Sequence, residues 1–163
     1  MRQQCCNSLL VNFLIRYTIQ KLTEEAIFNY LSGIDQYLVP ALSSRVDIRS
    51  YSDKLHCKAI HFCALDNDCL IGMAACYFNE PAGKVGYISS FSVSELYRNK
   101  SVAANLFKLI SDYGLSKGFE KIRLGVYRLN EPAIMLYKKS GFHKEKQDSN
   151  NEFVMMTCLL KEV

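Results

Sequence analysis

The segment from residue 85 to residue 126 constrains the fold more than any other part of the sequence. Residues 85–93 are rich in β-branched and aromatic side chains, which predicts a strand, and a polar connection follows it. Apolar side chains then recur at helical spacing from Val102 to Tyr113, and residues 121–126 predict a second strand. A helix that joins two strands in this way is a crossover, so we expect these two strands to lie parallel in one sheet.

The rest of the chain predicts further strands and helices around this unit. Patterns of hydrophobicity and turn residues place strands at 13–20, 59–65, 69–78, 142–146 and 153–160, and helices at 23–40, 47–58 and 130–141. Gly33 is a point at which the helix at 23–40 could be split. The resulting order, β-α-α-β-β-β-α-β-α-β-β, predicts an α/β (α+β) fold with a mixed, mostly antiparallel sheet of about seven strands flanked by about four helices. Residues 1–12 are expected to be an N-terminal extension, and residues 13–163 a single domain.

Composition narrows the class of protein. With 49% apolar and 22% charged residues in a chain of 163, the sequence is too apolar for a disordered protein and long enough for one core. The apolar stretch at 9–15 is far shorter than the roughly 20 residues that cross a bilayer, so we expect no membrane segment. Seven cysteines without a C-x-x-C pair, and three histidines without metal-ligand spacing, predict no disulfide framework and no metal. We therefore expect a cytoplasmic protein with reduced thiols.

The polar turn that precedes the helix at 102–113 is a candidate phosphate site. It contains the cations Arg98 and Lys100 and the small residues Ser101 and Ala103. A helix N-terminus offers unpaired backbone N–H groups and a partial positive charge, which suit a phosphate. An ordinary capped helix start with a solvated basic turn would give the same local pattern. The formal net charge of +4 is compatible with one polyphosphate ligand and too small to predict nucleic-acid binding.

Two motifs together resemble the GNAT superfamily of acyl-CoA-dependent N-acyltransferases. Residues 93–103, VSELYRNKSVA, resemble the superfamily signature V-x-x-x-Y/F-R/Q-x-x-G-x-G/A, and residues 130–142, NEPAIMLYKKSGF, resemble N-x-x-A-x-x-x-Y-x-K/R-x-G-F. The resemblance covers roughly residues 13–160, and it departs from the signature at Ser101, where the family usually has glycine. If this position requires a positive φ, serine costs about 1 kcal/mol there, whereas in a helical conformation it costs little.

The resemblance implies a splayed parallel pair, formed by the strands near 85–93 and 121–126, that binds coenzyme A. The strand edge that would pair with the pantetheine arm is supplied by the backbone of Phe91, Ser92 and Val93. The pyrophosphate would be held by Arg98, Asn99, Lys100, Ser101, Val102 and Ala103, chiefly through main-chain N–H groups. Asn130 would cap its helix or reach the coenzyme arm. The small side chain of Ala133 would leave that face of the helix free of bulk. Phe91 and Val93 could equally be plain core residues.

The resemblance also implies an enzyme that transfers an acetyl group from acetyl-CoA to a primary amine by direct attack in a ternary complex. Tyr137 would lie beside the coenzyme sulfur and protonate it as the thiolate leaves; the alternative is a packed aromatic side chain. The sequence does not identify the base that deprotonates the amine. The candidates are Glu80, Tyr87, Ser89, Ser90 and Glu95.

The acceptor could be a small molecule or a peptide, and its pocket is expected at residues 30–49, 79–84 and 147–152. We expect no nucleic-acid or membrane partner, and a homodimer is compatible with an enzyme of this size. A non-catalytic coenzyme A-binding or regulatory module of the same fold is the alternative function.

Overall fold

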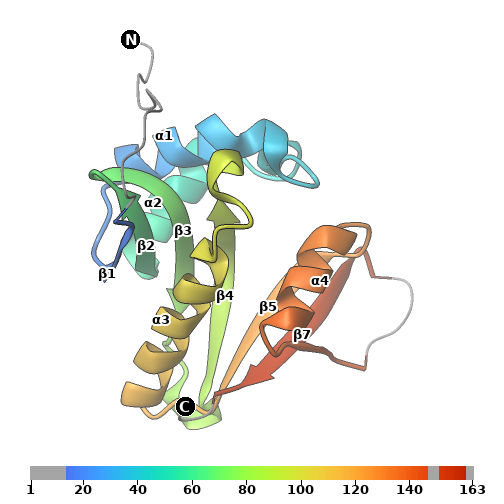
Figure 1. The fold of residues 1–163 in the computed structure, drawn as a ribbon. Coiled ribbons are helices and arrows are strands. Elements are labelled where there is room, and N and C mark those ends of the chain that lie inside the picture. The colour runs from blue at the N-terminus through green and yellow to red at the C-terminus, as the bar shows by residue number, and fades with distance from the viewer. Residues whose placement is uncertain (1–13, 147–150, 161–163) are drawn as a thin grey trace.

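The computed structural model describes residues 14–146 and 151–160, and all of its strands belong to one sheet (Figure 1). The strands are β1 (Arg16–Ile19), β2 (Ile60–Asp66), β3 (Cys69–Tyr77), β4 (Val85–Val93), β5 (Lys121–Tyr127), β6 (His143–Lys144) and β7 (Phe153–Leu159). Their order across the sheet is β1-β2-β3-β4-β5-β7-β6, and every neighbouring pair is antiparallel except β4 and β5. The predicted mixed sheet with one parallel pair is therefore confirmed, and the predicted extension at 1–12 lies outside the described residues.

Four α-helices cover the two faces of the sheet. They are α1 (Glu24–Ile34), α2 (Ile48–Lys58), α3 (Val102–Ser116) and α4 (Glu131–Lys139), and short 3-10 turns lie at Asp35–Tyr37 (η1), Leu42–Ser44 (η2), Pro81–Gly83 (η3) and Glu95–Tyr97 (η4). Helices α1 and α2 pack on one face, where Ile27, Leu31 and Leu55 are buried against strands β2 and β3. No helix in the described part of the chain is long and apolar enough to span a membrane.

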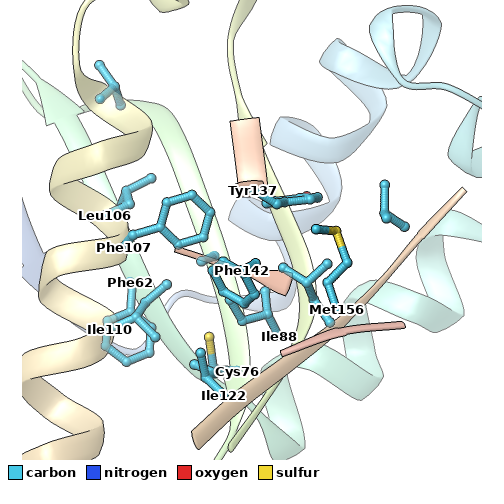
Figure 2. Packing of buried hydrophobic residues seen from close by; sticks show 14 of the residues in the cluster. Phe62, Cys76, Ile88, Leu106, Phe107, Ile110, Ile122, Tyr137, Phe142 and Met156 are labelled. Carbon is cyan, nitrogen blue, oxygen red and sulfur yellow. The ribbon is translucent and has the colours of Figure 1, made fainter. Parts of the chain in front are cut away.

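The larger core lies on the opposite face, under α3 and α4. Leu106 and Ile110 of α3 pack there with side chains from five strands and from the segment after α4, as Figure 2 shows for Phe62, Ile122 and Met156. Side chains of this size bury most of their apolar surface, which makes this cluster the main source of stability. The cluster therefore fixes α3 against the middle of the sheet.

The ends of the helices agree with the capping residues in the sequence, except at the end of α1. The side chains of Asp47 and Asn130 accept the N–H groups of Ser50 and Ala133, as N-caps do. The predicted helix at 23–40 is wrong beyond residue 34. Asp35 accepts both the backbone N–H (2.9 Å) and the hydroxyl (2.6 Å) of Ser43, and these bonds hold the chain in a fold-back over 35–43.

The parallel strands β4 and β5 separate partway along their length. Their pairing runs from Val85–Lys121 to Ile88–Leu124 and then stops, although both strands continue. Just beyond the last pair, β4 has a bulge, because Ser90 lies opposite Ala75 while Ile88 lies opposite Cys76, so that one extra residue is accommodated. In Figure 1, β5, β7 and α4 diverge from β4 as the two arms of a V.

Candidate active site

A cavity of about 210 Å³ opens where β4 and β5 separate. We call it the cleft. One wall is the half of β4 that follows Ile88, and the opposite wall is the end of β5 with α4. The third wall comes from residues 37–46 between α1 and α2, which we call the 37–46 segment. The side chains and backbone that line the cleft belong to Leu38, Val39, Pro40, Leu42, Arg45, Val46, Tyr51, Ser89, Ser90, Phe91, Ser92, Gly125, Val126, Tyr127, Asn130, Ala133, Tyr137 and Phe153.

The β4 wall offers a backbone edge. Residues Phe91, Ser92 and Val93 pair with β3 on one side, and none of the described strands pairs with them on the other. The Phe91 ring stacks on Phe107 with centroids 4.2 Å apart, so this side chain also belongs to the core. A strand edge of this kind binds an extended amide-containing chain by adding it as a further strand.

The turn between β4 and α3 has the backbone shape of an anion cradle. Asn99 and Ser101 both have positive φ, 61° and 60°, and Ser101 is the N-cap of α3 without a hydrogen bond from its own side chain. The N–H groups of Val102 and Ala103 lie in the first helical turn, which has no intrahelical acceptors for them. Consecutive backbone N–H groups at a helix N-terminus next to left-handed residues are suited to phosphate oxygens.

The two cations of this turn have different surroundings. Arg98 donates from Nε to the Val93 carbonyl and from Nη2 to the Tyr37 carbonyl, each at 3.3 Å. Lys100 lies with its Nζ 5.3 Å from the centroid of the Tyr97 ring. Arg98 therefore joins the end of β4 to the 37–46 segment, in addition to carrying positive charge beside the cradle.

Tyr137 lies at the point where the core meets the cleft. Its ring is buried and meets those of Phe91, Phe107 and Phe142 at centroid distances of 6.2, 5.9 and 5.9 Å, and Figure 2 shows it at the edge of this aromatic group. Burial raises the pKa of Tyr137 to about 12. A tyrosine is already protonated near neutral pH and burial favours this form further, which is the form that a proton donor needs.

Asn130 connects α4 to the third wall. Its Oδ1 accepts the Ala133 N–H at 3.2 Å, and its Nδ2 donates to the Val39 carbonyl at 3.1 Å. The cap that the sequence predicts is confirmed, and the contact to Val39 is an addition. Ala133 lines the cleft one turn before Tyr137, so the structure brings these three residues of the second motif to one wall.

Sequence reasoning missed Tyr51 of α2. Its hydroxyl donates to the Ser89 carbonyl at 3.0 Å and lies 3.1 Å from the Ser89 Oγ, directly at the β4 bulge. Burial raises the pKa of Tyr51. In the sequence this residue is one of the apolar side chains at helical spacing in 47–58, and nothing local indicates that it reaches β4.

Two of the five candidate bases line the cleft. Ser89 and Ser90 line the cleft, whereas Glu80, Tyr87 and Glu95 are not among its lining residues. In the part of the chain that the structure describes, neither a carboxylate nor an imidazole lines the cleft. The walls therefore offer hydroxyl groups and backbone for proton transfer.

Comparisons with known proteins agree with this geometry. The model of the acetyltransferase (GNAT) family matches residues 19–142. The thialysine N-epsilon-acetyltransferase of Bos taurus is 25% identical over 129 residues, which are 76% of this chain and 75% of that protein.

Solved structures share the fold at low sequence identity. A spermidine N-acetyltransferase chimera from Vibrio cholerae and hSSAT has a TM-score of 0.69 at 17% identity, and the match covers 88% of this chain and 95% of that one. The PaiA N-acetyltransferase of Thermoplasma acidophilum, solved in complex with coenzyme A, has a TM-score of 0.69 at 18% identity, with 88% and 99% covered.

Proposed function

Because the chain belongs to the acetyltransferase (GNAT) family and is an N-acetyltransferase, we propose that it transfers the acetyl group of acetyl-CoA to a primary amine by direct attack in a ternary complex. The observation that carries this proposal is the position of Tyr137, which lines the cleft where β4 and β5 separate. Acetyl-CoA supplies an acetyl group activated as a thioester, and the described residues supply a binding groove and a proton.

The groove fits an extended coenzyme. The backbone edge of Phe91, Ser92 and Val93 would hold the pantetheine arm, and the turn from Arg98 to Ala103 would hold the pyrophosphate. The left-handed residues Asn99 and Ser101 support this assignment, because such a turn directs successive N–H groups to one point. Charge from Lys100 and Arg98 would strengthen the contact, which should therefore weaken as salt rises.

Tyr137 would act as the general acid. Its hydroxyl donates a proton to the coenzyme sulfur as the bond between sulfur and the acetyl carbon breaks, and it regains a proton from solvent. Backbone groups of β4 near the bulge at Ser89 would polarise the thioester carbonyl. Both roles use groups that are already fixed, the phenol by three aromatic rings and the backbone by pairing with β3.

The amine would enter between β4 and the 37–46 segment. It must lose a proton before it attacks, and the hydroxyls of Ser89 and Tyr51 form a short path from the bulge toward α2. The curated relatives are named for thialysine, an amino acid with an amine at the end of its side chain, and one structural neighbour is named for spermidine, a polyamine. We propose that the acceptor is a small amine of one of these two kinds, an amino acid or a polyamine.

The assay is replacement of Tyr137 by phenylalanine. We expect kcat to fall by about 10²-fold or more, the usual contribution of a positioned acid, while the dissociation constant for coenzyme A measured by calorimetry changes by less than about threefold. Tyr113→Phe is the matched control, because Tyr113 packs on the Phe62 and Phe78 rings and does not line the cleft. Unchanged turnover of Tyr137→Phe at saturating substrates would remove this residue from the mechanism.

A cytoplasmic location is part of the proposal, because Cys63 and Cys76 are packed as buried free thiols in the cores on the two faces of the sheet. A homodimer stays a prediction.

A further inference from the structure

The cleft has an unbalanced positive charge. Among its described lining residues Arg45 is the single charged side chain, and all the others are apolar, aromatic, hydroxyl or amide groups. Arg45 follows η2 in the 37–46 segment, and its guanidinium carbon lies 5.4 Å from the centroid of the Phe153 ring. The aromatic face supports the guanidinium from one side and leaves its N–H edge for another group.

Arg45 lines the cleft without a counter-ion among the described residues, as Arg98 also has none, whereas two other arginines of the same region are paired. Arg49 forms ion pairs with Glu24 (3.4 Å) and Glu25 (2.7 Å), and Arg123 with Glu145 (2.6 Å). Within the described residues, no carboxylate oxygen lies within 4.0 Å of Arg45. A guanidinium beside a cavity, with its neighbours already paired, is the arrangement that binds an anion by charge-assisted hydrogen bonds.

This charge restricts what the acceptor can be. The reacting amine of any acceptor arrives largely as an ammonium ion, and a polyamine brings further cations that would meet Arg45, with no carboxylate among the described lining residues to bind them. An acceptor with an anion at its far end has the complementary charge. Apolar side chains of the 37–46 segment, such as Leu38 and Val46, would contact the methylene chain between the two ends.

We propose that the acceptor is a primary amine that carries an anionic group, a carboxylate or a phosphate, and that Arg45 binds this group while the amine reaches the thioester. The inference rests on the proposed function and names the substrate class of that same site. Phe153, beside Arg45, and Tyr127, whose ring centroid lies 5.9 Å from that of Phe153, also line the cleft and would contact the chain of the acceptor.

The experiment compares amines that differ only in the anion. Release of thiol from acetyl-CoA is measured with lysine and its decarboxylated counterpart 1,5-diaminopentane, with 6-aminohexanoate and hexylamine, and with spermidine. We expect kcat/KM to be about tenfold to hundredfold higher for the amine with a carboxylate, the usual gain from a hydrogen bond to a charged group. 4-Aminobutyrate and 3-aminopropyl phosphate are included to separate carboxylate from phosphate recognition.

Two variants assign the preference to Arg45. Arg45→Gln should lower kcat/KM for the anionic amines by about tenfold or more, mainly through KM, and should leave equal or improved rates for 1,5-diaminopentane. Arg45→Lys should restore part of the loss, because it keeps the charge without the planar N–H edge. Arg49→Gln is the control, since Arg49 is paired with two glutamates and does not line the cleft.

The outcomes separate this inference from the proposed function. Efficient acetylation of 1,5-diaminopentane or spermidine, with no preference for the anionic amines, would overturn the role of Arg45 and leave the acetyltransferase intact. An anion preference that survives Arg45→Gln would do the same. No thiol release with any amine, together with no binding of coenzyme A in calorimetry, would overturn the proposed function itself.

Discussion

Replacing Ser101 by glycine should make the protein more stable. Ser101 has φ 60° and ψ 7°, so a residue with a Cβ occupies the left-handed region at the position where the family signature has glycine. Its hydroxyl does not compensate, because the side chain makes no capping bond to α3. The strain is therefore stored in the backbone of the turn that we assign to the pyrophosphate.

The gain follows from two opposing terms. The left-handed conformation costs an ordinary L-residue about 1–2 kcal/mol, which glycine would not lose. Glycine also lowers the free energy of unfolding by about 0.4–1 kcal/mol, because the unfolded chain samples more conformations at a glycine. The net increase in the free energy of unfolding is then about 0.5–1 kcal/mol. With a urea m-value of about 2 kcal/mol/M, the unfolding midpoint of the ligand-free protein should rise by about 0.25–0.5 M.

Two further variants test the cause of that rise. Asn99→Gly changes a residue with nearly the same φ, 61°, but asparagine tolerates this region, so we expect less than about half the gain. Ser101→Ala keeps the strain and removes only the hydroxyl, and its midpoint should match that of the natural chain within about 0.2 M. A midpoint for Ser101→Gly at or below that of the natural chain would refute the reasoning, as would equal gains at the two positions.

Two glycines and one histidine allow further tests. Gly86→Ala should lower the free energy of unfolding by about 1–3 kcal/mol, because its Cβ would lie 2.5 Å from Cε1 of Phe78, whose ring is packed against three other aromatic rings. Gly33→Ala, with nothing within 4 Å of its Cβ, should raise this free energy by about 0.5–1 kcal/mol. Equal changes for the two variants in urea unfolding would contradict this packing argument. Burial lowers the pKa of His61, and its Nδ1 accepts the Leu22 N–H at 3.1 Å. As the pH falls, His61 therefore binds a proton in the unfolded chain at a higher pH than in the folded protein, so the free energy of unfolding should fall below about pH 6.5. A flat profile of urea midpoints between pH 7.5 and 5 would contradict this expectation.

Local patterns in the sequence predict the elements that have local causes. The strand at 85–93 and the caps at Asp47 and Asn130 depend on neighbours within a few residues, and the structure has them as predicted. The end of α1 has no such local cause. The backbone N–H and the hydroxyl of Ser43 donate to the Asp35 carboxylate only after the chain has folded back. Periodicity continues past residue 34 in the sequence even though the helix does not.

The candidate site likewise has one part that continuous motifs in the sequence indicate and another that only the tertiary fold brings together. The two motifs mark the side that we propose for the coenzyme, since each is a continuous segment that can be compared with a family signature, although the left-handed φ of Ser101 does not follow from a serine. Arg45, Tyr51 and Phe153 come from a turn, a helix and the last strand, and they meet at the cleft only through the tertiary fold. The bulge at Ser89 is equally hidden, because a strand of alternating side chains carries no local sign of an extra residue.

The two motif segments also position the 37–46 segment, the wall that we propose to select the acceptor. Arg98, in the turn before α3, donates to the Tyr37 carbonyl, and Asn130, at the start of α4, donates to the Val39 carbonyl. These bonds fix the beginning of the 37–46 segment to both arms of the V, and Arg45 lies a few residues further along that segment. A change in the separation of the arms would therefore move the guanidinium relative to Tyr137. Because the same two side chains belong to the motifs that we assign to the coenzyme, the proposed coenzyme and acceptor sites share their supports, and replacing Arg98 or Asn130 should change the binding of both substrates.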